Sequence, residues 1–313
     1  MVTTNFTFLS NDEKTAIHAV KWVPDSGEYK AILQITHGMQ EYIERYEGFA
    51  EFLTEKGYMV VGHDHLGHGA SVLSEAELGY FCEKNPSDVL VQDIHKLRAL
   101  IQEENPDTPY FMAGHSMGSF LLRKYLTCYN ENLRGAIIMG TGFIPEKMTN
   151  LAMKITTFVG NIRGWKHRSK LIQSLAFGAD YKAFDMTGEH PENSWLTKDV
   201  EVVNAYYKDP KCNYIFTVNG YKGLFETVNY SCNPENVAKV PKKLPLFIIS
   251  GDKDPVGSLG AGVKIVYDMH KDAGALDVTY KLYENDRHEL VNETDKQKVF
   301  EDVLAWMNVR IDT

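Results

Sequence analysis

The chain has 313 residues, of which 43% are hydrophobic and 24% are charged, and both fractions are typical of a soluble globular protein. Its formal net charge of -9 disfavours a nucleic-acid partner, because that kind of binding depends on Lys and Arg side chains that neutralise phosphates. The sequence shows neither an amino-terminal signal peptide nor an apolar run long enough to cross a bilayer. We therefore expect a soluble, cytoplasmic protein without a transmembrane segment.

Short apolar runs alternate with segments of helical period, which predicts an α/β fold with a mostly parallel eight-stranded sheet and helices on both faces. The first two runs, NFTFLS and IHAVKWVP, predict an antiparallel pair. The other strands are predicted at KAILQITHG, YMVVGHD, PYFMAG, RGAIIMG, LPLFIISG and VTYKLYEN. Apolar stripes that include Phe49, Leu97, Leu121 and Val303 predict the covering helices.

Between the strands near Met139 and Phe247 the sequence has helical periodicity but no convincing core strand. We interpret residues 145–224 as an inserted helical cap, and residues 1–144 and 225–313 as the core. Because open α/β sheets bind ligands at the carboxyl ends of their strands, this insertion would form a lid over the site. A surface insertion without a function is the alternative.

Residues 114–118 read GHSMG, which matches the G-x-S-x-G motif of a nucleophile elbow. In this motif a strained turn between a strand and a helix exposes a serine hydroxyl at the top of the sheet. The predicted strand PYFMAG precedes the motif and a predicted helix follows it. Ser116 is therefore the candidate nucleophile, and a buried structural turn is the alternative.

A serine hydroxyl needs a histidine base and an acid that orients the histidine. Asp254 follows the strand LPLFIISG, and His288 follows the last strand, so loops at the ends of neighbouring strands could bring both to Ser116. Asp252 is the rival acid, but Asp254 lies further from the strand end. The other late histidine, His270, falls within a predicted helix.

Hydrolysis also requires donors for the oxygen that becomes negative in the tetrahedral intermediate. The backbone N–H of Met117, directly after the nucleophile, is one candidate. The other is the backbone N–H of Met39, in the loop ITHGMQE after an early core strand. His37 and Gly38 would shape this loop.

Taken together, these motifs resemble the monoacylglycerol lipase and lysophospholipase-like branch of the serine α/β-hydrolases, a group of serine aminopeptidase S33-type hydrolases. HGMQEYIERY is similar to the branch's H-G-x-x-E-H-x-x-R-Y motif, with Tyr42 where histidine is usual. GHDHLGHGAS is similar to its D-x-x-G-x-G-x-S turn, and GHSMGS has its form of the elbow. SGDKDPVG and RHELVNE carry its acid at Asp254 and its histidine at His288.

The likeness extends into the insertion, where LTKDVEVVNAYYKDPKC is similar to a cap segment of bacterial members, with Val200 where proline is common. The resemblance implies an α/β-hydrolase fold and a carboxylic-ester hydrolase that needs no metal or organic cofactor. Its implied substrates are monoacylglycerols, lysophospholipids or other small acyl esters. A non-lipid carboxylesterase or an amidase on the same fold is the alternative.

Two other classes of protein remain open. HDHLGH contains His63, His65 and His68, a spacing similar to a zinc-binding signature of metallo-hydrolases, although Gly67 stands where that signature has aspartate. A non-catalytic ligand-binding protein could also keep a hydrolase fold.

Three further features of the sequence concern the cap and the cysteines. The cap would supply an acyl pocket through residues such as Leu151, Ile155, Phe158 and Trp165, and it would touch lipid transiently. Because an apolar stripe at helical spacing more often packs internally, none of these residues is assigned to binding. It also carries a basic run, which is either a head-group attractant or a solvated face: Arg163, Lys166, His167, Arg168 and Lys170. The four cysteines are expected to be buried thiols, with a Cys212–Cys232 bridge as the alternative.

Overall fold

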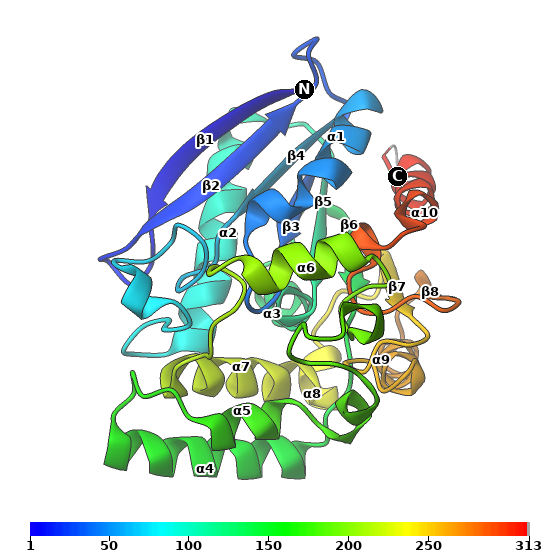
Figure 1. The fold of residues 1–313 in the computed structure, drawn as a ribbon. Helices are drawn as coiled ribbons and strands as arrows, with labels where there is room; N and C mark the ends of the chain where they lie inside the picture. Colours follow the sequence, from blue (N-terminus) through cyan, green and yellow to red (C-terminus); the bar gives the residue numbers. More distant parts are fainter. Residues whose placement is uncertain (312–313) are drawn as a thin grey trace.

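The computed structural model of the chain describes residues 1–311. Its centre is an eight-stranded sheet with the strand order β1-β2-β4-β3-β5-β6-β7-β8 (Figure 1). The strands are β1 (Val2–Leu9), β2 (Ala16–Val23), β3 (Ala31–Thr36), β4 (Tyr58–His63), β5 (Tyr110–His115), β6 (Leu133–Met139), β7 (Leu246–Gly251) and β8 (Val278–Tyr283). β2 is antiparallel to β1 and to β4, and β3 to β8 run parallel. The predicted fold class and all eight predicted strands are therefore confirmed.

Helices cover both faces of the sheet, because successive side chains of each buried strand point to opposite faces. In β5, Phe111 and Ala113 pack with α1 and α10, whereas Tyr110 and Met112 pack with the helices of the other face. The helices of the first face are α1 (Glu47–Glu55) and α10 (Lys296–Asn308). Those of the second face are α2 (Pro86–Glu104), α3 (Met117–Cys128) and α9 (Ala261–Asp272).

The segment between β6 and β7 consists mainly of helices. They are α4 (Glu146–Arg163), α5 (Lys170–Ala176), η3 (Ala179–Ala183), η4 (Pro191–Asn193), α6 (Val200–Lys208), α7 (Val218–Ser231) and α8 (Pro234–Val237). α7 packs against α2 and α3, and α4 and α5 lie outside α7, while α6 lies in front of the sheet (Figure 1). The predicted boundary at residue 224 falls inside α7, and the division into core and cap stays a prediction.

Short 3-10 helices occupy three of the loops: η1 (Ile43–Tyr46), η2 (Glu75–Glu77) and η5 (Leu290–Asn292). No helix within residues 1–311 is both long and apolar enough to cross a membrane. All four cysteines have free thiols, so Cys212 and Cys232 do not form the bridge that the sequence left open, and Cys128 is exposed rather than buried.

Candidate active site

Ser116 lies on the tight turn between β5 and α3. Its backbone has φ 52° and ψ -123°, a conformation that residues with a side chain rarely adopt, so the turn is strained. The flanking glycines are required by close backbone contacts. A Cβ atom on Gly118 would lie 2.1 Å from the carbonyl oxygen of Thr36, and one on Gly114 would lie 2.5 Å from the carbonyl oxygen of Gly118. The motif therefore builds a sharp turn that leaves the Ser116 side chain half-buried at the start of α3.

His288 and Asp254 meet through a direct hydrogen bond. Nδ1 of His288 lies 3.0 Å from Oδ2 of Asp254, and both side chains are buried. The hydroxyl of Ser250 and the backbone N–H of Val256 also donate to the Asp254 carboxylate, at 2.8 and 2.9 Å. Burial alone would raise the pKa of Asp254, but His288 and these donors hold it below the usual range. The ionised carboxylate therefore favours the His288 tautomer with a proton on Nδ1.

The two rival residues take other positions. Asp252 accepts the backbone N–H of Asn285 at 2.8 Å, so it holds the turn after β8. His270 is buried in α9 next to the charge of Arg123, and burial lowers its pKa to about 3. Neither residue contacts His288 in the way that Asp254 does.

The ring of His288 lies close to the Ser116 turn. It is 4.6 Å from the ring of His115, the residue before Ser116, measured between centroids. A Cβ atom on Gly140 would lie 3.1 Å from His288 and 3.2 Å from His115, so a side chain there would crowd both rings. Within residues 1–311 no hydrogen bond joins the Ser116 hydroxyl to His288, and such bonds often tighten only when substrate is bound.

The loop after β3 packs directly against the Ser116 turn. A Cβ atom on Gly38 would lie 2.9 Å from Cβ of Ser116. Met39 is therefore the next residue after the position at which the loop contacts the Ser116 turn. Buried His37 shapes the loop as expected, because its Nδ1 donates to the carbonyl oxygen of Gly38 and its Nε2 accepts the N–H of His65. Met117, the other candidate donor, is the first residue of α3.

Tyr42, the departure from the family motif, links this loop to the inserted segment. Its hydroxyl donates to Oδ2 of Asp209 at 2.8 Å, directly after α6. The substituted position therefore forms a contact between the loop after β3 and α6.

The histidines of HDHLGH are buried in a turn that Gly67 and Gly69 make with positive φ. Burial lowers the pKa of His63 to about 3 and that of His68 to about 4, so both are neutral. Within residues 1–311, the ring nitrogens of His63, His65 and His68 that could bind a metal do not come within 4.8 Å of one another as a set of three. The structure thus gives the zinc alternative no geometric support.

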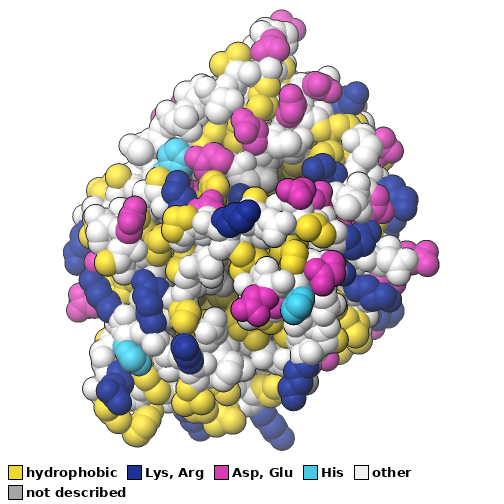
Figure 2. All heavy atoms as spheres, in the orientation of Figure 1, with side chains coloured by type: hydrophobic (Ala, Val, Ile, Leu, Met, Phe, Trp, Pro, Cys, Tyr) yellow, Lys and Arg dark blue, Asp and Glu magenta, His cyan; other side chains and the backbone are white. Residues whose placement is uncertain are grey.

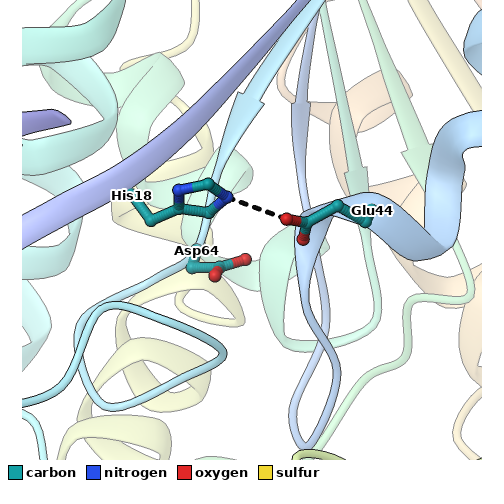
Figure 3. Close-up of side chains that lie close together, drawn as sticks. All are labelled: His18, Glu44 and Asp64. Atoms are coloured by element: carbon teal, nitrogen blue, oxygen red, sulfur yellow. Dashed lines mark hydrogen bonds and ion pairs between the residues drawn. The ribbon is translucent and has the colours of Figure 1, made fainter. Parts of the chain in front are cut away.

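Two other groups do meet that distance, and Figure 3 shows one of them: His18, Glu44 and Asp64. His18 Nε2 bonds to Glu44 at 2.8 Å. The two oxygens of Asp64 accept the backbone N–H groups of Ile43 and Ala70, at 2.8 and 2.7 Å. Asp64 is thus engaged in holding the turn and the loop after β3. The second group is Asp286, Glu293 and Asp295, where Lys198 already pairs with the carboxylates.

A groove of about 930 Å³ is lined by residues of the segment between β6 and β7 and by Gln40 of the loop after β3. Figure 2 shows hydrophobic side chains in the hollow between α6 and the layer of α5 and α7. Seven aromatic side chains line the groove: Phe177, Tyr181, Phe184, Trp195, Tyr206, Tyr207 and Tyr214. Trp195 also contacts His288, so the groove reaches the candidate base through this side chain.

The structure corrects the expectation for the cap side chains. Leu151 and Phe158 are 59% and 66% exposed on the outer face of α4, so they do not line a pocket. Trp165 packs its ring over Gly160 of α4. The aromatic lining comes instead from residues 177–214. Of the aromatic side chains there, Tyr206 and Tyr207 lie on α6 and the others lie outside the α-helices.

Sequence reasoning also missed the residues that hold the site together. Trp195 was not assigned because no motif marks it. Glu41 belongs to the H-G-x-x-E motif, and that spacing was the available signal, but it was given no role. The structure shows that its carboxylate accepts the N–H of Gly38.

Comparison with known proteins assigns the family. The family described as "Serine aminopeptidase, S33" matches residues 27–295, a range that includes Ser116, Asp254 and His288. The chain belongs to this family. The match confirms the resemblance to the serine α/β-hydrolases that the motifs indicated.

Curated relatives and solved structures agree with this assignment. The chain is 25% identical over 286 residues to a monoacylglycerol lipase from Mycolicibacterium smegmatis, covering 91% of this chain and 90% of the relative. It is 27% identical over 301 residues to monoglyceride lipase from Mus musculus, covering 93% and 86%. A thermostable carboxyl esterase from Bacillus coagulans has a TM-score of 0.90 at 27% identity, covering 99% of both chains. Monoglyceride lipase from Saccharomyces cerevisiae shares the fold at 20% identity, covering 98% and 94%, with a TM-score of 0.76.

Proposed function

We propose that this chain is a serine carboxylic-ester hydrolase that cleaves acyl esters, such as monoacylglycerols or lysophospholipids, through an acyl-enzyme. The observation that carries the proposal is the hydrogen bond between His288 and buried Asp254, beside the strained turn of Ser116. Membership of a serine hydrolase family supports it, as do relatives named as lipases and esterases.

In the proposed mechanism His288 accepts the proton of Ser116 while the serine oxygen attacks the ester carbonyl. Asp254 keeps the other ring proton on Nδ1, so that Nε2 is free to act as the base, and it stabilises the imidazolium that forms. The backbone N–H groups of Met39 and Met117 stabilise the oxyanion. The alcohol then leaves with a proton from His288, and water activated by the same histidine releases the acid.

Residues 145–224 are proposed to act as the cap over this site. The aromatic groove and the contact of Trp195 with His288 support this role. Four hydrophobic side chains at helical spacing form an exposed stripe on α4, between 59% and 66% exposed: Met148, Leu151, Phe158 and Ile162. An exposed apolar stripe of this kind supports a transient contact with lipid. A cytoplasmic location stays a prediction of the sequence.

The decisive experiment is a substrate panel of p-nitrophenyl esters, monoacylglycerols, lysophospholipids and anilides, with Ser116→Ala as the control. The proposal predicts hydrolysis of the esters and a loss of several orders of magnitude in Ser116→Ala. Faster anilide cleavage would favour the amidase alternative. Inhibition by chelators without fluorophosphonate labelling would favour a metallo-hydrolase, and no turnover at all would favour a binding protein.

Lipid contact is tested separately by sedimentation with phosphatidylcholine vesicles. Phe158→Asp should weaken binding to the vesicles and leave hydrolysis of a soluble p-nitrophenyl ester unchanged, because the side chain lies on the outer face of α4. Equal sedimentation of both proteins would contradict the assignment of this face.

A further inference from the structure

Glu41 is a buried carboxylate, 2% exposed, that contacts several loops of the candidate site. Oε1 accepts the backbone N–H of Gly38, the hydroxyl of Tyr46 at 2.9 Å and Nδ1 of His115 at 3.0 Å. Oε2 accepts a guanidinium N–H of Arg45 at 3.1 Å. A buried carboxylate with this many donors is ionised, and its pKa lies below the usual range although burial by itself would raise it.

The first of these contacts fixes the loop that carries one candidate oxyanion donor. Gly38 directly precedes Met39, and a Cβ atom on Gly38 would lie 2.9 Å from Cβ of Ser116. Because the loop and the Ser116 turn are already in close contact, the Glu41 bond sets where the Met39 backbone lies relative to Ser116. Backbone donors of an oxyanion hole lose their effect when they are displaced.

A second contact reaches His288 through His115. Nδ1 of His115 faces the Glu41 carboxylate, and Nε2 lies 3.2 Å from the backbone carbonyl oxygen of His288. Both partners are acceptors, so the ring donates to both of them only when it is protonated. In that form His115 connects the residue before Ser116 to the backbone of the candidate base.

A third contact reaches the same backbone through Arg45. Its guanidinium makes two hydrogen bonds of 2.7 Å to the carboxylate of Glu289, in addition to the one to Glu41. Glu289 directly follows His288, and all of these groups are buried or nearly so. Paired Arg–carboxylate bonds of this kind are strongly directional.

We propose that Glu41 is a positioning residue for the hydrolysis: its carboxylate fixes the Gly38–Met39 backbone and, through His115 and Arg45, the backbone of His288 relative to Ser116. This role rests on the proposed function. It differs from a general stabilising role because it makes kcat depend on one charge that touches no reacting atom.

The role also implies a pH dependence, since His115 must be protonated to donate from both nitrogens. The groups that face it are Glu41, Tyr46, Arg45, Glu289, and His288 with its partner Asp254. Burial would lower the pKa of His115, but the bond and charge of Glu41 raise it above 6.5. A raised pKa means that the arrangement is intact at low pH and is lost as pH rises through that value, so kcat should fall on the alkaline side.

The test compares Glu41→Gln with Glu44→Gln, a change of the same kind on the neighbouring helix η1, where Glu44 is exposed and bonds to His18 (Figure 3). With p-nitrophenyl butyrate, Glu41→Gln should lower kcat by ~10- to 100-fold and change KM by less than about twofold. The alkaline fall of kcat should move to lower pH in this variant, because His115 loses its counter-charge. Glu44→Gln should match the wild type in kcat, KM and pH profile.

An active wild type with a Glu41→Gln variant of unchanged kcat and pH profile would overturn the positioning role. A wild type that hydrolyses no ester and takes up no fluorophosphonate would instead overturn the proposed function. If Glu41→Gln shows no cooperative thermal transition, His115→Asn replaces it in the same assay. This variant removes the imidazolium and should lower kcat by about tenfold with little change in KM, and an unchanged kcat would overturn the role.

Discussion

Trp195 stacks on His288, with ring centroids 5.0 Å apart and ring planes inclined by 30°. Trp195 belongs to the segment inserted between β6 and β7, whereas His288 follows β8. The backbones are joined as well, because the N–H of His288 lies 3.4 Å from the carbonyl oxygen of Trp195 and that of Glu289 lies 2.7 Å from the carbonyl oxygen of Leu196. The insertion therefore holds both the ring and the backbone of His288.

Trp195→Ala should for this reason lower kcat on a soluble ester by about tenfold, since a displaced base is less effective. The loss of a buried aromatic ring should also lower the free energy of unfolding by about 3 kcal/mol. Steady-state kinetics and urea denaturation measure the two effects. Trp165→Ala is the matched control, because that ring packs on Gly160 of α4, and it should leave kcat unchanged. Equal kcat values for Trp195→Ala and Trp165→Ala would contradict a role of Trp195 in holding His288 in place.

Asp254→Asn should lower kcat by about 10⁴-fold, because an amide in place of the carboxylate favours the wrong tautomer of His288. Asp252→Asn is the matched control two residues away. It removes a charge that holds the turn at Asn285 and should change kcat by less than about threefold while lowering the melting temperature slightly. A larger loss of kcat in Asp252→Asn than in Asp254→Asn would reverse the assignment of the acid.

Gly118→Ala should destabilise the protein by more than about 3 kcal/mol, because its Cβ would overlap the carbonyl oxygen of Thr36 at 2.1 Å and force the backbone to move. Gly48→Ala is the opposite case. Gly48 is exposed in α1 and a Cβ there meets no atom within 4 Å, so alanine should stabilise the helix by about 0.5–1 kcal/mol. Thermal denaturation of the two variants checks both signs, and a stable Gly118→Ala would contradict the close packing of the elbow.

The stability of the fold should depend on pH through its buried histidines. Burial lowers the pKa of His37, His63 and His270 to about 3 and that of His68 to about 4, against 6.5 for an unburied imidazole. A lowered pKa means that the stabilisation is present above pH 6.5 and is lost as pH falls, because the unfolded chain binds protons that the folded chain does not. Each such histidine should contribute a slope of about 1.4 kcal/mol per pH unit.

Urea denaturation between pH 7.5 and 5 measures this slope. His63→Leu should make this slope shallower, because it removes one of the buried imidazoles. It removes no hydrogen bond, since neither ring nitrogen of His63 has a partner. His190→Gln, at an exposed position, should leave the slope unchanged. A slope that is the same in the wild type and in His63→Leu would contradict a neutral, buried His63.

Most of the fold could be predicted from the sequence, because the strands are short, continuous apolar runs bounded by turns. The runs at β3, β5 and β7 are buried on both faces, and that pattern distinguishes central parallel strands. The inserted segment was predicted as helical but not in detail. Its aromatic residues around Trp195 pack without a regular period, so no local pattern predicts which of them face the groove.

The parts of the candidate site that depend on neighbouring residues in the chain could be predicted. The parts that depend on contacts between distant residues could not. The glycines around Ser116 predict a tight turn because only small residues allow it. Asp254 could be preferred over Asp252 from its distance to the strand end, and its hydrogen bond to His288 distinguishes the two carboxylates directly. Glu41 is part of a recognisable motif, but its contact with His115 joins residues 74 positions apart in the chain.

The central claim is that Ser116 is the activated nucleophile, and reaction with a fluorophosphonate tests it most directly. Intact-mass and peptide-mapping measurements should show one adduct per chain, on Ser116, formed in proportion to the loss of esterase activity. The same treatment of His288→Ala should give a much slower reaction, since the base is missing. Full esterase activity after labelling, or an adduct on a different residue, would contradict the account.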